Sequence, residues 1–399
     1  MKNPFKTQQL RRPTPHASEP QHAHRPDYIL LLVVLFLLCF GFIAVLSASS
    51  VLSFDRFGNN YYYFKHQLFY GGVIGLAAFA ILAKIPYYKL RKYALPFFVI
   101  VVILLIVVDV AGTSFGGAQR WIALGPIVFQ PSEIAKFGIV LSLAAWFARA
   151  GEGAKTFKHG LIPFCIMMGI IAVLLIGQPD VGTLSVVALT SVVVYFTAGA
   201  AWAHMGLIIA GGIGSLAYLI HVAPYRAARL TVFLNPDIDP QGIGYQINQA
   251  LLAIGSGGLF GLGLGQSRQK YNYLPEAASD SIFAIIAEEF GFVRTILLIA
   301  LFVFLAYRGY SIARNIEDPF GKYLAVGITT WLCFQAFLNI AALTGLIPLT
   351  GIPLPFISYG SSALIISLAA AGVLFNISRY TKKSATRSHL VRGSHGKVA

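Results

Sequence analysis

Ten long apolar segments, each close to the length of a membrane-spanning helix, constrain this chain more than any other feature. A helix needs about 20 predominantly apolar residues to cross the hydrocarbon core of a bilayer. Of the 399 residues, 57% are apolar and only 11% are charged, whereas a soluble domain carries about a quarter charged residues. We therefore expect an all-α polytopic membrane protein with about ten transmembrane helices. The expected spans are 28–49, 68–83, 95–111, 133–148, 161–177, 183–199, 202–222, 282–306, 323–343 and 361–377.

The distribution of Lys and Arg predicts the orientation of these spans. The two tails and the connections 84–94, 149–160 and 307–322 hold 21 of the 30 basic residues against five acids, whereas the opposite loops hold seven basic and six acidic residues. Because cytoplasmic loops are enriched in Lys and Arg, both termini are expected in the cytoplasm. The net charge of +15 is then a consequence of topology, and no nucleic-acid partner is needed to explain it.

Three regions follow from this pattern. Residues 1–27 form a polar N-tail that we expect to be disordered, residues 28–377 form the transmembrane domain, and residues 378–399 form a basic cytoplasmic C-tail. The first apolar run is longer than the roughly 7–15 residues of a signal-peptide core, so it is expected to remain as an anchor.

One outer loop, 223–281, is far longer than an ordinary connection. Its middle, 245–260, is apolar and rich in small residues, which indicates an interfacial or re-entrant helix rather than a full span. Glycines between 257 and 265 favour close packing or a hinge over a phosphate cradle, because the strand–turn–helix context of a nucleotide site is missing. Arg226 and Arg229 are suited to a phosphate or pyrophosphate, although lipid headgroups are an alternative ligand.

Several polar residues lie close to the expected membrane spans. Glu133 and Lys136 are three residues apart, so they share a helix face. A buried local ion pair is the favoured interpretation of these two residues, yet ionisable groups at membrane depth are also functional candidates. Gln130 precedes this pair at the helix start, and Arg120 lies in the preceding outer loop.

Two further outer segments are expected to shape a polar cavity. Gln178 and Asp180 flank a proline after the fifth expected span, where a tight turn with a helix cap is weighed equally with a lining role. Ser358 and Tyr359 follow a segment too rich in Pro and Gly for regular helix. Irregular backbone near a membrane surface is tolerated where it lines a cavity, so we expect their hydroxyls there.

Acidic residues mark the end of the long outer loop. Glu276 and Asp280 come just before the eighth span, and Glu288 and Glu289 lie about two turns inside it. The residues alone favour Asp280 or Ser279 as a helix cap; the functional alternative is Asp280 as a general base in a partly desolvated cleft. Two adjacent acids at depth are expensive, so at least one of Glu288 and Glu289 must face a cation or water.

Taken together, these segments resemble the SEDS family (shape, elongation, division and sporulation), which contains FtsW, RodA and SpoVE. The resemblance covers everything except the two tails, and its motifs occur in the family order. They are Gly117-x-x-Arg120-Trp121-Ile122, Gln130-Pro131-Ser132-Glu133-x-x-Lys136, Gln178-Pro179-Asp180, Gly242-x-Gly244-Tyr245-Gln246, Ser256-Gly257-Gly258, Leu274-Pro275-Glu276, Glu288-Glu289-x-Gly291 and Pro353-Leu354-Pro355-Phe356-Ile357-Ser358-Tyr359-Gly360.

The resemblance implies a peptidoglycan glycosyltransferase that polymerises lipid II at the outer face of the bacterial cytoplasmic membrane. The essential Asp of the family corresponds to Asp280, which would act as the general base. By charge and side, Arg120, Lys136, Arg226 and Arg229 are candidates to position the pyrophosphate, and a divalent cation (Mg or Mn) could share that work. The other expected substrate-binding residues are Gln130, Glu133, Gln178, Asp180, Glu276, Ser358 and Tyr359. The implied partners are lipid II, the growing glycan strand, a class B penicillin-binding protein and the division or elongation machinery.

The chain departs from the family pattern around Asp280. His-Thr usually precedes this Asp and Phe follows it, whereas Ala278, Ser279 and Ser281 occupy these positions here. Arg294 replaces a small residue and is expected to pair with Glu288 or Glu289. Two other functions stay open at this point: a lipid II flippase, and a non-catalytic scaffold for the penicillin-binding protein. The segment 271–276 favours the division branch of the family.

Overall fold

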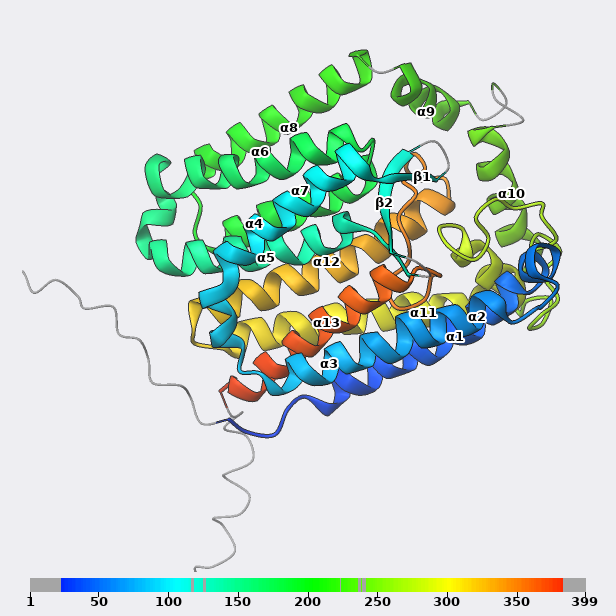
Figure 1. Cartoon of the computed structure of the whole chain (residues 1–399), viewed down its shortest axis with the longest axis horizontal. Helices are drawn as coiled ribbons and strands as arrows, with labels where there is room; N and C mark the ends of the chain where they lie inside the picture. Colours follow the sequence, from blue (N-terminus) through cyan, green and yellow to red (C-terminus); the bar gives the residue numbers. More distant parts are fainter. Residues whose placement is uncertain are drawn as a thin grey trace, which may run out of the picture.

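The computed structural model describes residues 23–115, 118–124, 127–222, 224–235, 238 and 242–382 (Figure 1). Most of the predicted disordered N-tail, and the basic C-tail from residue 383 onwards, lie outside the described residues. The same is true of Gly117 in the first family motif.

The expected set of about ten spans is confirmed within the described part of the chain. Nine helical segments there are long and apolar enough to cross a membrane, and the apolar helix Val181–Thr197 is a tenth, shorter one. The helices of this bundle are α1 (Tyr28–Phe57), the continuous run α2–η1–α3 (Tyr62–His66, Gln67–Val73, Ile74–Lys84), α4 (Tyr87–Ala111), α5 (Pro131–Ala150), α6 (Ile162–Gly177), α7 (Val181–Thr197), α8 (Trp202–Val222), α11 (Ile282–Asn315), α12 (Pro319–Leu343) and α13 (Ser361–Ile377).

The expected boundaries are correct for helices that end where their apolar residues end. Helices α8 and α13 begin and end at the expected residues. Helices α1 and α11 are longer than expected because each continues past its apolar core through a polar stretch, which for α1 includes Asp55 and Arg56. Apolar length identifies the part of a helix in lipid and carries no information on its polar extension.

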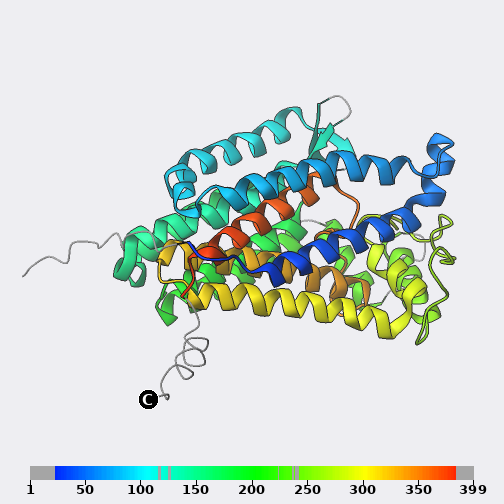
Figure 2. The same ribbon diagram turned by 90° about the horizontal axis from the view of Figure 1, so that it is seen from below.

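The helices differ strongly in how deeply they are buried. In α12 and α13, 78% of the most apolar stretch is buried, whereas in α8 the figure is 6%. Helices α12 and α13 therefore form the centre of the bundle, with Trp331 fully buried, and α8 lies at its edge (Figures 1 and 2). The side chains of α8 face outwards, where lipid is the solvent.

The outer loop between α4 and α5 forms a small antiparallel sheet that the sequence did not predict. Its strands are β1 (Thr113–Phe115), β2 (Ala118–Leu124) and β3 (Ile127–Phe129), in the order β1-β2-β3. Ile122 of β2 pairs with Phe129 of β3, and β3 runs directly into the start of α5. This sheet fixes the position of Arg120 above the bundle.

The long outer loop contains two helices, α9 (Pro224–Leu234) and α10 (Ile243–Ser256). Helix α10 covers most of the segment expected to form a non-spanning helix, and its 14 residues are too few to cross a bilayer. Helix α9 was not predicted.

The glycine-rich segment after α10 packs against a break in α11. Gly291 has φ +75°, and an added Cβ there would lie 2.1 Å from the backbone nitrogen of Gly261. The amides of Leu262 and Gly263 donate to Glu288 and Glu289 carbonyls, and the amide of Phe292 donates to the Gly258 carbonyl. These bonds satisfy backbone groups that the break in α11 leaves without helical partners. Close packing is thus the role of these glycines.

Both ends of the described chain lie side by side at the end of the bundle opposite the sheet and α10 (Figure 1). The amide of His24 donates to the Arg379 carbonyl at 2.8 Å, and the amide of Lys382 donates to the Asn315 carbonyl at 2.9 Å. This agrees with an even number of spans. Their cytoplasmic location stays a prediction.

Candidate functional site

A cavity of about 120 Å³ opens at the end of the bundle where α9 and α10 lie. It lies between α9, α10, α12, the turn before α11 and the Pro-rich segment before α13. Its walls are formed by Arg229, Gln246, Glu276, Asp280, Asn339, Ala342, Leu343, Leu349, Thr350 and Gly351. Three predicted site residues, Arg229, Glu276 and Asp280, therefore meet in one place.

The carboxyl group of Asp280 is partly buried in this cavity. Burial, followed by the negative charge of Glu276, raises its pKa to about 7, and Asp180 acts in the same direction. Arg120 and Arg229 act against this shift because their positive charges favour the ionised form. A carboxyl group that titrates near neutrality is suited to accept a proton from a sugar hydroxyl.

The interpretation of Asp280 or Ser279 as a helix cap is wrong. The residue before α11 is Ser281, and no side chain caps the helix there. The Ser279 hydroxyl donates instead to the Glu276 carboxylate at 2.6 Å, and the Asp280 side chain makes no hydrogen bond with the described residues.

Arg120 is held by the turn between α6 and α7. Its Nε donates to the Gln178 carbonyl at 2.8 Å, and its Nη2 donates to the Pro179 carbonyl. The Gln178 side chain in turn donates to the Leu105 carbonyl in α4. Arg120 and Gln178 are thus brought together, with both side chains engaged by protein backbone.

Asp180 joins the beginnings of α5 and α7. One carboxylate oxygen accepts from the Thr183 amide and caps α7, which is one of the two alternatives weighed for this residue. The other oxygen accepts from the Ser132 hydroxyl at 3.0 Å and from the Gln130 amide at 3.5 Å. Gln130 and Asp180 therefore contact each other directly.

Glu133 and Lys136 form the expected ion pair inside the bundle. Their charged atoms are 2.8 Å apart, and the side chains are 1% and 2% exposed. Lys136 also donates to the Gln335 side chain at 2.7 Å and lies over the Trp331 ring. Gln335 in turn donates to the Pro353 carbonyl, so this pair links α5 to α12 and the Pro-rich segment.

Ser358 and Tyr359 support the turn that carries Asp280. The Ser358 hydroxyl donates to the Ser279 carbonyl at 2.7 Å, and the Tyr359 amide donates to the Ala278 carbonyl at 2.8 Å. The Tyr359 hydroxyl lies 3.2 Å from Nδ1 of His66. Neither side chain is among those that line the cavity described above.

Helix α9 contains both Arg226 and Arg229, but the structure describes the side chain of Arg229 only. Arg229 lines the cavity and donates to the Leu349 carbonyl at 3.3 Å. The side chain of Arg226 lies outside the described residues.

Sequence reasoning missed three polar side chains of the cavity, Gln246, Asn339 and Thr350. Gln246 belongs to a quoted family motif, and that was the available signal. Asn339 is one of two side-chain amides in the largely apolar helix α12, and its role becomes visible only from the carbonyl groups that the fold places beside it.

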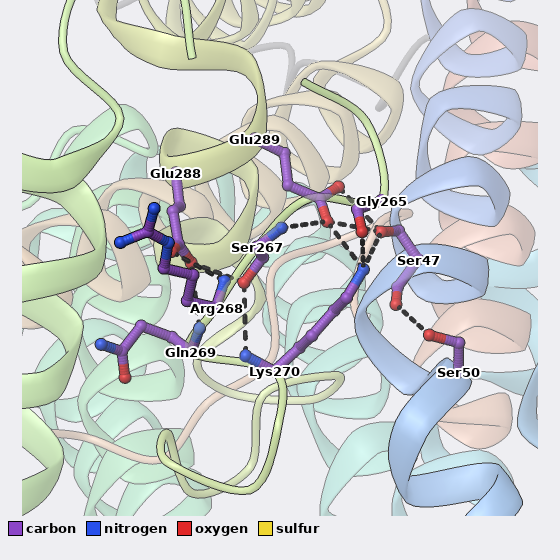
Figure 3. A network of polar contacts seen from close by, with 9 residues as sticks. All are labelled: Ser47, Ser50, Gly265, Ser267, Arg268, Gln269, Lys270, Glu288 and Glu289. Atoms are coloured by element: carbon purple, nitrogen blue, oxygen red, sulfur yellow. Dashed lines mark hydrogen bonds and ion pairs between the residues drawn. The ribbon is translucent and has the colours of Figure 1, made fainter. Parts of the chain in front are cut away.

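A second polar cluster joins the loop 267–270 to α1 and α11, and most of its side chains are buried (Figure 3). Lys270 lies 3.3 Å from Glu289, with side chains 4% and 2% exposed, and the Ser47 hydroxyl of α1 donates to both Glu289 oxygens. Glu288 accepts from the Ser267 hydroxyl and the Arg268 amide. The expectation that one of the two acids faces a cation is thus confirmed.

The expected pairing of Arg294 with Glu288 or Glu289 is wrong. Arg294 donates to the Phe260 carbonyl at 2.8 Å and is exposed. The break at Gly291 separates Arg294 from the two acids, whose oxygens the loop 267–270 and Ser47 occupy.

The described side chains contain no preformed site for a resident divalent cation. Among them, no group of three or more His, Cys, Asp or Glu residues is arranged to hold a metal ion. Hard cations such as Mg²⁺ bind through several oxygen ligands, and the cavity offers two carboxylates beside an arginine. We derive no step through a metal.

Fold and cavity together define a multi-pass membrane protein with an acidic site at one end of its helical bundle. The sequence matches the FtsW/RodA/SpoVE family, described as cell cycle proteins, over residues 28–383. The chain belongs to this family.

Among its relatives, stage V sporulation protein E of Bacillus subtilis is 41% identical over 90% of this chain and 98% of its own length. A probable peptidoglycan glycosyltransferase FtsW of Geobacter sp. is 38% identical over 90% of this chain and 98% of its own length.

Solved structures share the fold. A chain from a structure titled for the coordination of polymerization and crosslinking by a peptidoglycan synthase complex superposes with a TM-score of 0.74 at 27% identity, covering 90% of this chain and 99% of that one. The rod shape determining protein RodA of Thermus thermophilus superposes with a TM-score of 0.66 at 28% identity, covering 90% and 98%.

Proposed function

We propose that this chain is a peptidoglycan glycosyltransferase that polymerises lipid II at the outer face of the cytoplasmic membrane, with Asp280 as its general base. The observation that carries the proposal is the Asp280 carboxyl group, which lines an outer cavity and has a pKa near neutrality. The names of the FtsW relatives support the reaction class.

In this reaction the ionised Asp280 removes the proton of the acceptor sugar 4-hydroxyl. The oxygen then forms a bond to the anomeric carbon of the donor, and the bond from that carbon to undecaprenyl pyrophosphate breaks with its electron pair. The proton remains on Asp280 until solvent accepts it. Arg229, the cation of the cavity wall, is placed to stabilise the charge that develops on the leaving group.

Arg120 and Lys136 support this site in a different way. Arg120 raises the share of ionised Asp280 by its charge, while its guanidinium binds two carbonyl groups. Lys136 is occupied by Glu133 and Gln335, so we assign it to the framework of the site rather than to the pyrophosphate.

The partner proposed for the chain is a class B penicillin-binding protein in the division or elongation machinery. A structural neighbour comes from a complex that coordinates polymerization and crosslinking, and crosslinking is a transpeptidase activity. The segment 271–276 favours the division assembly. A non-catalytic scaffold would make the same contact without needing Asp280.

Polymerisation of purified lipid II by the chain with its penicillin-binding partner tests this function. Asp280→Asn keeps the shape of the side chain and removes the base, so we expect at least a 100-fold loss of glycan product. Product of wild-type amount and length from Asp280→Asn would refute the assignment of the base. A labelled lipid II flux assay in vesicles, run alongside, would reveal transport activity instead.

A further inference from the structure

Hydrogen bonds from three separate elements hold the turn before α11 at four successive residues. The Ala278 and Ser279 carbonyls accept from Tyr359 and Ser358. The Asp280 carbonyl accepts from the side chain of Asn339 in α12. The Ser281 hydroxyl accepts from Gln246 of α10.

Asn339 makes the only one of these bonds that reaches the backbone of Asp280 itself, among the described residues. Its Nδ2 donates to the Asp280 carbonyl and to the Ile352 carbonyl, both at 2.8 Å. The Asn339 side chain is 3% exposed, and it belongs to the cavity wall. The two N–H groups of this one amide therefore join the turn before α11 to the Pro-rich segment before α13.

These two bonds can fix both the orientation of the Asp280 carboxylate and its depth in the cavity. Helix α12 lies in the centre of the bundle, so Asn339 is anchored to one of its two most buried helices. The Ile352 carbonyl precedes Pro353, where the backbone is stiff. Gly351 lies beside the Asp280 carboxylate, because a Cβ built on Gly351 would be 3.4 Å from Oδ2 of Asp280.

We propose that Asn339 is a positioning residue, which sets the orientation and depth of the Asp280 carboxylate by binding its backbone carbonyl. The inference rests on the function proposed above, because it gives Asn339 a purpose only if Asp280 is the base. Asn339 does not touch the reacting atoms. It determines whether Asp280 points at them.

Charged groups of both signs surround the position at which Asn339 holds Asp280. Glu276 of the same turn and Asp180 at the start of α7 face Asp280 with negative charge. Arg120 of β2 and Arg229 of α9 face it with positive charge. If the turn loosens, water reaches the carboxyl group and the burial that raises its pKa is lost.

The test compares Asn339→Ala with Asn376→Ala in the complex that polymerises lipid II. Asn376 is a matched control, because this buried asparagine of α13 also binds two backbone groups: its Nδ2 donates to the Ala83 carbonyl at 2.7 Å, and its Oδ1 accepts from the Tyr87 amide at 2.9 Å. Ala83 and Tyr87 flank the connection between α3 and α4, at the end of the bundle away from α9 and α10 (Figure 1). Rates are normalised to the monodisperse fraction of each preparation, so that poor folding does not imitate a catalytic defect.

For Asn339→Ala we expect kcat to fall by about 10- to 100-fold with little change in KM. A displacement of a reacting group by about 1 Å reduces the rate by up to this factor. The acid limb of its pH profile should move to lower pH. Asn376→Ala should lose stability while keeping the wild-type pH profile and kcat.

Two results would overturn the inference. One is a wild-type kcat and pH profile for Asn339→Ala. The other is an equal loss of kcat in both variants with an unshifted pH profile, which would assign Asn339 a purely structural role. Failure of the proposed function has a different signature, namely full activity of Asp280→Asn, and it would remove the base that Asn339 is inferred to position.

Discussion

Asp280 can accept a proton only when its carboxyl group is ionised, so its surroundings decide the pH range in which it works. Burial and the nearby Glu276 raise its pKa to about 7, well above the value of about 3.9 for a free aspartate. The charge of Arg229 limits this rise. The pKa of this carboxyl group therefore lies near neutral pH rather than in the acid range.

The expected consequence is an acid limb in the rate profile. Because the ionised form is the active one, polymerisation should fall tenfold for each pH unit below about 7 and level off above it. Arg229→Gln removes a charge that favours ionisation, so its acid limb should move to higher pH. Initial rates on lipid II between pH 5 and 9 measure both, and a flat profile across pH 7 would contradict the role of Asp280.

A second prediction at the residue scale concerns Lys270 and Glu289. Their ion pair is almost completely buried, and removal of one partner from such a pair costs about 3–5 kcal/mol because the other charge is left in a dry environment. Lys270→Met should lower the free energy of unfolding by about this amount. Unfolding of the detergent-solubilised protein, followed by thermal melting or by SDS titration, measures the change.

The matched control is Lys155→Met. Lys155 pairs with Glu152 on the surface, where both side chains are largely exposed, and such pairs contribute little. The double variant Lys270→Met/Glu289→Met should recover part of the loss, because neither charge is then stranded. Equal melting points for Lys270→Met and Lys155→Met would show that the buried pair does not stabilise the fold.

At the scale of elements, helix α11 is two helices joined at Gly291. The break lets the backbone of the outer loop pair with the backbone of the helix, through the bonds of Leu262, Gly263 and Phe292. Glycine at 291 satisfies two demands at once, a positive φ and a close approach to Gly261. The outer part of α11 therefore belongs as much to the loop as to the bundle.

Gly291→Ala should disturb this crossing. A Cβ at 2.1 Å from the Gly261 nitrogen forces the two segments apart, and the positive φ adds strain of about 1 kcal/mol or more. We expect a lower melting temperature and a loss of polymerisation, because Asp280 lies just before the displaced segment. Gly169→Ala in α6 is the control, since no atom lies within 4 Å of its added Cβ; a Gly291→Ala protein as stable as this control would contradict the role of the crossing.

The elements that the sequence predicted are those with a local signal. Apolar length located all ten spans, and for α8 and α13 it also gave both ends. The sheet around Arg120 escaped because its strands are short, with only three residues in β1 and three in β3. Strand pairing depends on partners that a short run of residues does not reveal.

The site was predicted less completely because its geometry depends on residues far apart in the chain. Asp280 was chosen through a family resemblance, while its local sequence favoured a helix cap. Asn339 was missed because its partners at 280 and 352 are brought to it by the fold. The predicted partner of Arg294 was wrong because the neighbouring sequence does not indicate the break in α11 at Gly291, which directs Arg294 away from the two acids.

At the scale of the whole molecule, the bundle has two chemically different ends. One end carries the cavity, the sheet and α10, and the other carries both ends of the described chain (Figure 1). There Asp27 caps α1 and also pairs with Arg308 of α11. The excess of Lys and Arg in the connections of this end predicts that it faces the cytoplasm.

Labelling of single cysteines tests this orientation. Cys39, Cys165 and Cys333 are first replaced by alanine, and one cysteine is then introduced at Asn272 or at Lys382, both of which are exposed. A membrane-impermeant maleimide applied to intact spheroplasts should label Asn272→Cys at once and Lys382→Cys only after permeabilisation. Labelling of Lys382→Cys in intact spheroplasts would place the chain the other way round.

The support of the Asp280 turn by Asn339, Ser358 and Tyr359 has a consequence for biosynthesis. A ribosome delivers these three residues after Asp280, and Tyr359 follows it by 79 positions. Ser47, which binds Glu289, has by contrast been in the membrane since the first span entered. The turn that carries Asp280 can therefore take its final shape only after the segment that leads into α13 has been made, so a chain truncated before Ser358 would lack these supports of the turn.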